Sequence, residues 1–139
     1  MPSFSVYVSK VTIVTPNEVE AGILTGIPVT DADSARKAAE WFLAKGVKKV
    51  VITMGGMGAF VADGDLRQMT PAFHVNALDT TGAGDAYNGG FVTALAEDKD
   101  MLDACRFAAA TAAISVQRMG TTPAMPTREE IDAFLKANA

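Results

Sequence analysis

Apolar positions along this chain switch between the period of a strand and the period of a helix. Val11 to Val14 and Val47 to Met54 are short runs rich in β-branched residues, which is typical of buried strands. Between these runs, the apolar positions from Ala35 to Leu43 recur three and four residues apart, which predicts a helix that buries one face. The first part of the chain therefore predicts strand, helical segment and strand in that order.

Capping residues predict where two helices in this first part begin and end. Asn17 can begin a short helix that ends before Gly26, because an asparagine side chain accepts hydrogen bonds from first-turn N–H groups. Thr30 or Asp31 is expected to cap the next helix, and Gly46 to end it.

The middle of the chain has the pattern of a β-hairpin. Gly58 to Ala62 and Leu66 to Met69 flank the turn residues Asp63 to Asp65, and an Asp-Gly pair favours a tight hairpin turn. His74 to Leu78 is predicted to be a further short strand.

The remainder of the chain has helical patterns, over about Ala83 to Ala96, Met101 to Arg118, and Arg128 to Ala137 after a Thr127 cap. This order of elements predicts an α/β fold, a layered α/β/α and Rossmann-like arrangement with helices on both faces of the sheet. No repeat, low-complexity tract or linker interrupts the pattern, so residues 1–139 are expected to form a single domain.

Composition and charge narrow the classes of function. The 139 residues are 49% hydrophobic and 20% charged, which is ordinary for a globular chain with a sizeable core. The net charge of −4 argues against nucleic acid or an anionic membrane as a partner. Cys105 is the only cysteine, which excludes an intrachain disulfide and favours a cytoplasmic location. No apolar stretch can span a bilayer, and Met1 to Lys10 lacks the pattern of a signal peptide.

The run from Leu78 to Gly90 has the most informative chemical pattern in the chain. It reads Leu-Asp-Thr-Thr-Gly-Ala-Gly-Asp-Ala-Tyr-Asn-Gly-Gly, with Gly82 and Gly84 at the expected start of a helix. The unpaired N–H groups and positive dipole end of such a helix bind anions, and Asp85 can accept a proton from a hydroxyl there. A purely structural explanation remains open, in which the glycines form a tight turn and Asp85 complements the dipole.

Two further segments permit a structural or a functional explanation. Asn17 and Glu20 are three residues apart, so both can face one side of a first helical turn and hold the water shell of Mg²⁺. Spacing alone favours a capping box instead. Thr53 to Gly58 follows a strand and contains three glycines, so a nucleotide can lie against its backbone. A glycine-rich link within a hairpin has the same pattern.

These segments together resemble the PfkB family of carbohydrate kinases, and in particular its ribokinase branch. Asp79 to Asp85 is similar to the second signature of that family, Thr15 to Glu20 to its Asn-x-x-Glu motif, and Ile52 to Gly58 to its nucleotide loop. The match runs from about Val11 to the C-terminus. Because such kinases are about twice as long, the resemblance implies a C-terminal, nucleotide-binding part without the N-terminal sugar-binding and lid part.

The resemblance implies transfer of a phosphoryl group from ATP to a primary hydroxyl of a small sugar, with ribose as the expected sugar. Asp85 would be the catalytic base that contacts the sugar hydroxyl, and the amides of Gly82, Ala83 and Gly84 would bind the developing charge. Asn17 and Glu20 would hold Mg²⁺. The nucleotide-binding residues implied are Asn17, Thr53, Met54, Gly55, Gly56, Met57, Gly58, Gly84 and Ala108. Ala108 replaces a polar residue that relatives often have beside the adenine.

A monovalent cation site, with K⁺ as the expected ion, is implied by the same resemblance. Its ligands would be the Asp79 carboxylate and four main-chain carbonyls, those of Thr81, Ser115, Arg118 and Gly120. Ala124 stands where ribokinase has a serine ligand, which removes one oxygen from a site for a hard cation. Asp79 also has a structural explanation as a turn-forming residue.

Alternatives from other classes follow from the same residues. A non-catalytic module, or a fragment inactive alone, would bind nucleotide or another anion without phosphorylating sugar. A dinucleotide-binding oxidoreductase is disfavoured because Gly82-x-Gly84 continues to Tyr87 instead of a third glycine. A homo-oligomer, most simply a twofold dimer, is expected if the strand edge at Val11 to Val14 is uncovered and the first ten residues pair with it.

Overall fold

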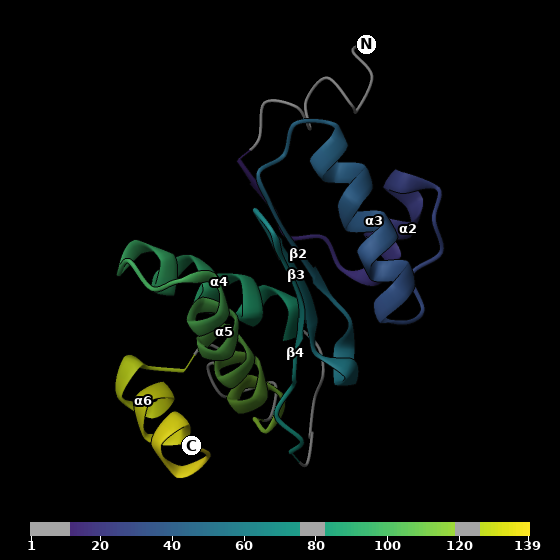
Figure 1. Ribbon diagram of the computed structural model, residues 1–139. Helices are drawn as coiled ribbons and strands as arrows, with labels where there is room; N and C mark the ends of the chain where they lie inside the picture. The colour runs from purple at the N-terminus through teal and green to yellow at the C-terminus, as the bar shows by residue number, and fades with distance from the viewer. Residues whose placement is uncertain (1–11, 76–82, 119–125) are drawn as a thin grey trace. The chain divides into compact units, whose positions relative to one another are not determined.

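The computed structural model describes residues 12–75, 83–118 and 126–139. The chain forms two compact units, Met1–Thr70 and Pro71–Ala139 (Figure 1). Within the described residues, the first unit contains a sheet and two α-helices, and the second contains three α-helices. In chain order the elements of the first unit are β1 (Ile13–Val14), α2 (Glu18–Thr25), α3 (Ala32–Ala44), β2 (Lys49–Thr53), the 3₁₀ turn η1 (Gly55–Met57), β3 (Ala59–Asp63) and β4 (Leu66–Thr70).

The sheet of the first unit has four strands in the spatial order β1, β2, β3, β4. β1 runs parallel to β2, whereas β2, β3 and β4 pair in antiparallel fashion, with Val51 opposite Val61 and Phe60 opposite Met69. The predicted hairpin is therefore present as β3 and β4. Its two-residue loop is Gly64-Asp65. Gly64 has φ of +57°, so the glycine occupies the first loop position, a position that favours glycine in one common type of hairpin turn.

Both helices of the first unit begin with a complete capping box. The side chain of Asn17 accepts a hydrogen bond from the N–H of Glu20 at 2.8 Å, and Asp31 accepts one from Ser34 at the same distance. The side chains of Glu20 and Ser34 accept in return from the cap N–H groups. This reciprocal pattern satisfies donors that a helix start leaves unpaired. Asp31, and not Thr30, is the cap of α3.

The core of the first unit lies between the sheet and the face of α2 and α3 that covers it (Figure 1). Ala38 and Ala39 are fully buried on α3, and Phe42 and Ile52 fill the space between helix and sheet. Side chains alternate along a strand, so Val51 points to the opposite face, where it is also fully buried. Both faces of the central strands are therefore covered.

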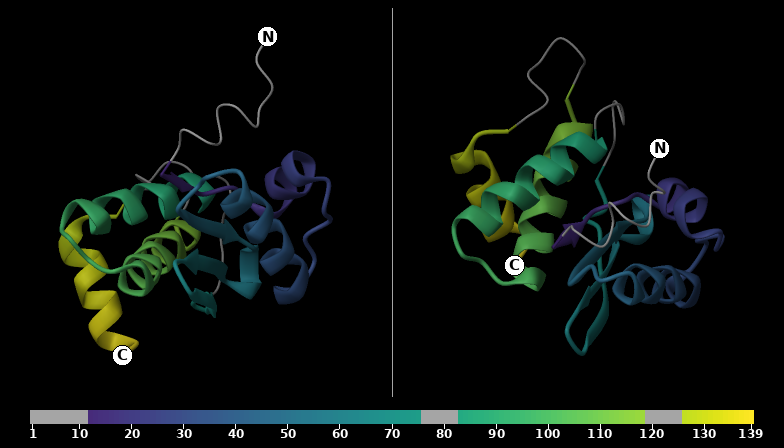
Figure 2. Two further views of the ribbon diagram at one scale, coloured as in Figure 1. Left: turned by 45° about the horizontal axis from the view of Figure 1, so that its top comes forward. Right: turned by 90° about the horizontal axis from the view of Figure 1, so that it is seen from above.

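The second unit consists of the helices α4 (Ala83–Ala96), α5 (Met101–Val116) and α6 (Arg128–Ala137). α4 and α5 pack side by side (Figure 2) and are joined by residues 97–100. Asp100 caps α5 by accepting a hydrogen bond from the N–H of Asp103 at 2.8 Å. Alanines fill much of the buried face of α5, and Cys105 lies among them with no exposed surface, as expected for a core residue.

Helix α6 is fixed by contacts near both of its ends. Arg128 forms ion pairs with Glu97, in the α4–α5 connection, and with Asp132. Phe134 packs edge to face on Phe73 with ring centroids 5.0 Å apart. Exposed ion pairs contribute little to stability, so the aromatic contact is the stronger of these attachments.

The predicted elements are present, with shifts of a few residues at their ends, except for one strand. His74 and Val75 are not in a strand, and residues 76–78 lie outside the described residues. The prediction was wrong here because a strand needs a neighbour for its backbone hydrogen bonds, which a short apolar pattern does not reveal. Within the described ranges, no helix combines the length and apolarity needed to cross a membrane.

Candidate functional site

In the first unit, two motifs that are far apart in sequence meet at the carboxyl ends of β1 and β2. Asn17 forms an isolated parallel bridge with Thr53. The N–H of Thr53 donates to the carbonyl of Pro16 at 3.0 Å. The cap of α2 and the loop after β2 are therefore neighbours. Open α/β sheets bind ligands at this end of their strands.

Asn17 and Glu20 form the capping box that their spacing favours. The N–H of Asn17 donates to Oε1 of Glu20 at 2.9 Å, and the N–H of Glu20 donates to Oδ1 of Asn17 at 2.8 Å. Both residues are exposed, and the second carboxylate oxygen of Glu20 has no hydrogen bond within the described part of the chain. The structural explanation is confirmed, and it leaves one carboxylate oxygen facing solvent.

This arrangement fits a magnesium ion that keeps most of its waters. Mg²⁺ in nucleotide sites is held by one or two carboxylates together with waters and phosphates. In the described ranges, no three His, Cys, Asp or Glu side chains cluster as a metal cage. The exposed carboxylate of Glu20 and the amide of Asn17 thus suit contact through water, and their metal role stays a prediction.

The predicted nucleotide loop is a tight turn with an open outer side. The N–H of Met54 donates to the carbonyl of Gly58 at 2.7 Å. Gly55 and Gly58 have φ of +56° and +98°, values that only glycine adopts without strain. A Cβ on Gly55 or Gly56 would meet no atom within 4 Å, so a ligand can approach the backbone.

The side chains of this loop differ in what they contact. Met54 is 2% exposed and belongs to the hydrophobic core, so only its backbone is available to a nucleotide. Met57 is 51% exposed, and Thr53 is half-buried at the end of β2. The loop therefore offers mainly backbone groups and one exposed apolar side chain.

In the second unit, the predicted anion site lies at the first turn of α4. Ala83 is half-buried, whereas Gly84 and Asp85 are exposed. A Cβ on Gly84 would meet nothing within 4 Å, so space is free beside the backbone of this turn, where a helix presents its first N–H groups. Gly82 lies outside the described residues. The helix predicted to begin at Ala83 is confirmed.

Two of the positions predicted on α5 are buried, Ala108 and Ser115. Ala108 has no exposed surface, and its role beside a nucleotide base stays a prediction. The carbonyl of Ser115 accepts a hydrogen bond from the N–H of Arg118 at 3.1 Å. The Ser115 hydroxyl is buried and has no partner within the described ranges. Three residues of the predicted cation site lie outside those ranges, Asp79, Thr81 and Gly120, and so does Ala124, which replaces the serine ligand of ribokinase.

Cys105 lies on the buried side of the α4–α5 pair. Burial raises the pKa of its thiol above the ordinary value, and a hydrogen bond with Tyr87 opposes this shift. A thiol with a raised pKa is a poor nucleophile. Cys105 is therefore a packing residue.

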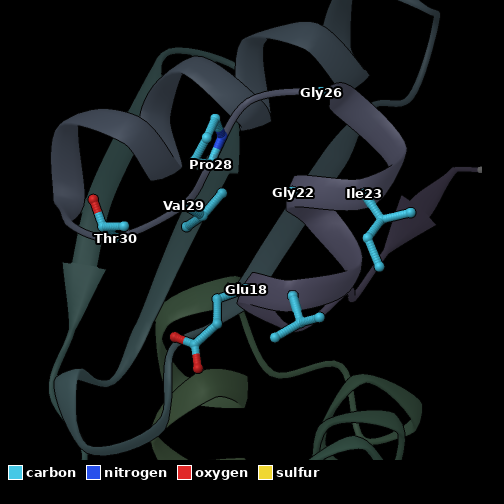
Figure 3. Close-up of a pocket in the computed structure, with 8 residues that line it drawn as sticks. Glu18, Gly22, Ile23, Gly26, Pro28, Val29 and Thr30 are labelled. Carbon is cyan, nitrogen blue, oxygen red and sulfur yellow. The ribbon is translucent and has the colours of Figure 1, made fainter.

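The sequence analysis did not identify a shallow apolar hollow of about 350 Å³ on the first unit. Figure 3 shows that its walls come from α2 and from the segment 26–30. Val19 and Ile23 line it and are 64% and 77% exposed, an unusual exposure for residues four apart on one helix. None of the predicted site residues lines this hollow.

Comparison with known proteins identifies the family. A model of the pfkB family carbohydrate kinases matches residues 1–128. The chain belongs to the pfkB family. Ribokinase of Haemophilus influenzae is 50% identical over 128 residues, which are 92% of this chain and 42% of that relative. Deoxyribokinase of Salmonella typhi is 39% identical over 132 residues, 95% of this chain and 43% of the relative. The chain thus spans less than half the length of these pfkB relatives.

Solved structures of pfkB members agree with this assignment. Ribokinase of Arabidopsis thaliana, complexed with ribose and ATP, matches this chain with a TM-score of 0.90 and 32% identity. The match covers 98% of this chain and 44% of the Arabidopsis chain. Ribokinase of Thermotoga maritima matches with a TM-score of 0.85 and 40% identity, and the match covers 95% of this chain and 44% of the Thermotoga chain. The predictions of an α/β ribokinase-like fold and of the family are confirmed, whereas the roles of single residues stay predictions.

Proposed function

We propose that the protein of which this chain is part transfers the γ-phosphoryl group of ATP to a primary hydroxyl of ribose. The observation on which the proposal rests is the exposed first turn of α4, where Gly84 and Asp85 lie at the N-terminal end of the helix, the end that binds anions. Relatives named ribokinase, and a related structure that holds ribose and ATP, support ATP and ribose as substrates.

In this proposal Asp85 accepts the proton of the sugar hydroxyl while that oxygen bonds to the γ-phosphorus. The bond from this phosphorus to the bridging oxygen breaks, and ADP leaves. Main-chain amides of Gly82, Ala83 and Gly84 donate to the negative charge that develops on the transferred group. Such transfer depends mostly on positioning and electrostatic stabilisation, which an exposed helix start is suited to provide.

The first unit would bind the nucleotide. The backbone from Thr53 to Gly58 offers an unobstructed side for it, and Asn17 lies next to that loop. Mg²⁺, when bound through Glu20 and Asn17, would neutralise phosphate charge. The Asp79 carboxylate and the main-chain carbonyls would contribute the K⁺ site, those of Thr81, Ser115, Arg118 and Gly120.

A second function, binding without catalysis, is favoured by the unobstructed backbone at Gly55 and Gly56, which a nucleotide can approach without a sugar. Calorimetry with Mg·ADP and a coupled assay with ribose and Mg·ATP separate the two. We expect weak nucleotide binding, with Kd on the order of 0.1–1 mM. Ribose-dependent ADP formation would support the kinase proposal for the chain itself. Binding without turnover would support the binding module. No binding at several millimolar would contradict the binding module and mean that the N-terminal part present in the relatives is needed to form the nucleotide site.

We further propose that the chain self-associates and works in the cytoplasm, where ATP is available and the Cys105 thiol stays reduced. β1 is at the edge of the sheet, and an unpaired edge favours pairing with another strand. Deletion of Met1 to Ser9 should lower the mass measured by light scattering or cause aggregation. A monomer at all concentrations, unchanged by the deletion, would contradict self-association.

A further inference from the structure

We propose that Gly90 is a positioning residue for the site at the first turn of α4. Its lack of a side chain lets α4 lie directly against Thr111 of α5, and this contact sets where Gly84 and Asp85 are held. The inference rests on the function proposed for this turn, and it assigns Gly90 a part in that function.

The contact between Gly90 and α5 leaves no room for a methyl group. A Cβ on Gly90 would be 2.4 Å from Oγ1 and 2.8 Å from Cβ of Thr111, and 3.2 Å from Cα of Ala108. Ordinary van der Waals contact begins at 3.4 Å. The shortest of these distances would therefore have to increase by about 1 Å, which close-packed interiors do not absorb without movement.

Thr111 cannot make this space by turning its side chain. It is fully buried, and its hydroxyl donates to the carbonyl of Phe107 at 2.8 Å. A β-branched side chain on a helix has few rotamers, and the positions of its Cβ and of Ala108 Cα do not depend on any rotamer. The strain must therefore be relieved by displacement of one helix relative to the other.

The connection between the helices directs this displacement toward the start of α4. The N–H of Lys99 donates to the carbonyl of Ala94 at 3.1 Å, and that of Asp98 to Leu95 at 3.0 Å. Only residues 97–100 join the two helices. These hydrogen bonds fold the connection back onto the last turn of α4, and its shortness keeps that end of α4 close to the start of α5. A push at Gly90 therefore tilts the opposite end outward.

The catalytic turn lies at that opposite end. Asp85 precedes Gly90 by five residues, about 7.5 Å along a helix axis. A tilt that opens the contact at Gly90 by about 1 Å therefore displaces Asp85 by at least as much. A misplacement of this size can reduce a rate by about 10²-fold.

A graded series of variants tests the inference, because the side chain at position 111 determines how closely a Cβ added at Gly90 approaches α5. With Gly90→Ala in place, the nearest atom is 2.4 Å away beside Thr111, 2.8 Å away beside Thr111→Ala and 3.2 Å away beside Thr111→Gly. Each variant of the full 139-residue chain is assayed for ribose-dependent turnover of Mg·ATP. We expect kcat to fall about 10²-fold relative to wild type for Gly90→Ala alone, and less for Gly90→Ala/Thr111→Ala. For Gly90→Ala/Thr111→Gly, called the Gly pair below, kcat should fall by no more than about threefold relative to Thr111→Gly alone. KM for ATP should change less than kcat.

Two controls separate positioning from general helix effects. Gly22→Ala makes the same change on α2, where the added Cβ would be 3.6 Å from the carbonyl of Ile27, and should leave kcat unchanged. Thr111→Gly alone measures how much kcat changes when only the Thr111 side chain is removed. If Gly90→Ala does not fold, the pair Gly90→Ala/Thr111→Ala takes its place. A folded variant of either kind with wild-type kcat, or no recovery in the Gly pair, would overturn the inference.

A second readout keeps this test independent of the proposed function. The amide resonances of Ala83, Gly84 and Asp85 should shift in the same graded order, while Gly22→Ala leaves them in place. If the wild-type chain turns over no sugar but these resonances follow the series, the kinase proposal fails for the chain and the positioning role holds. Resonances that stay fixed in Gly90→Ala would overturn the positioning role even in an active enzyme.

Discussion

The two predicted parts of the site are held in place by different interactions. In the first unit, backbone hydrogen bonds fix Asn17 beside Thr53 and close the loop from Met54 to Gly58. In the second unit, the start of α4 depends on side-chain packing against α5 at Gly90. A site built from backbone hydrogen bonds tolerates most side chains, whereas a site positioned by close packing is sensitive to one methyl group.

The largest effect is expected at Asp85, whose role belongs to the second unit alone. Asp85→Asn keeps the shape of the side chain but cannot accept a proton, so kcat should fall by about 10²–10⁴-fold. Nucleotide affinity, which the proposed function assigns mainly to the loop from Thr53 to Gly58, should stay within a few-fold by calorimetry. Thr93→Ala, on the exposed side of the same helix, is the control. Turnover near the wild-type value in Asp85→Asn would remove this residue from the role of base.

A comparison of matched core substitutions tests whether the units fold together. Phe42 and Phe91 are 1% and 2% exposed, and replacement of either by Ala should lower the free energy of unfolding by about 3–5 kcal/mol. If residues 1–139 form a single domain, both variants shift one common urea transition, followed by circular dichroism.

Two separate transitions, each moved by only one of the variants, would contradict the single domain. Val19→Ala and Val92→Ala are suitable controls because both side chains are 64% exposed. Each should change stability by less than about 0.5 kcal/mol.

Two helix caps of the same kind, one in each unit, distinguish a structural role from a binding role for Asn17. Asn17 and Thr127 both begin helices with complete capping boxes. Replacement of either by Ala should cost about 1 kcal/mol of stability. Only Asn17→Ala should also weaken Mg·ADP binding in calorimetry, and Asn17→Asp should keep the cap. Equal nucleotide affinity in Asn17→Ala and Thr127→Ala would leave Asn17 with a structural role only.

The smallest expected effect is a loss of stability at alkaline pH that comes from the buried Cys105 in the second unit. Because burial raises the pKa of Cys105 in the folded state, the unfolded chain releases the thiol proton first as the pH rises. The free energy of unfolding should therefore decrease above the ordinary thiol pKa of about 8.5, by up to about 1 kcal/mol near pH 9.5. Urea titrations of wild type and Cys105→Ala measure this difference. An identical pH dependence in both proteins would contradict it.

The sequence by itself determined the local structure and the family. Helix caps at Asn17, Asp31 and Thr127 and the hairpin around Gly64 follow from hydrogen bonds within a few residues, so local patterns predict them. The motif at Asp85 indicated the family and the start of α4 correctly. These features depend on residues that are close in the chain.

Only the tertiary structure decided which distant residues meet. The bridge between Asn17 and Thr53, the burial of Ala108 and the absence of a strand at His74 depend on neighbours far away in the sequence. Gly90 is the clearest case, because its importance comes from Thr111, 21 positions later. A glycine in a helix pattern indicates only weaker helix propensity, and the packed helix beside it shows why no side chain fits there.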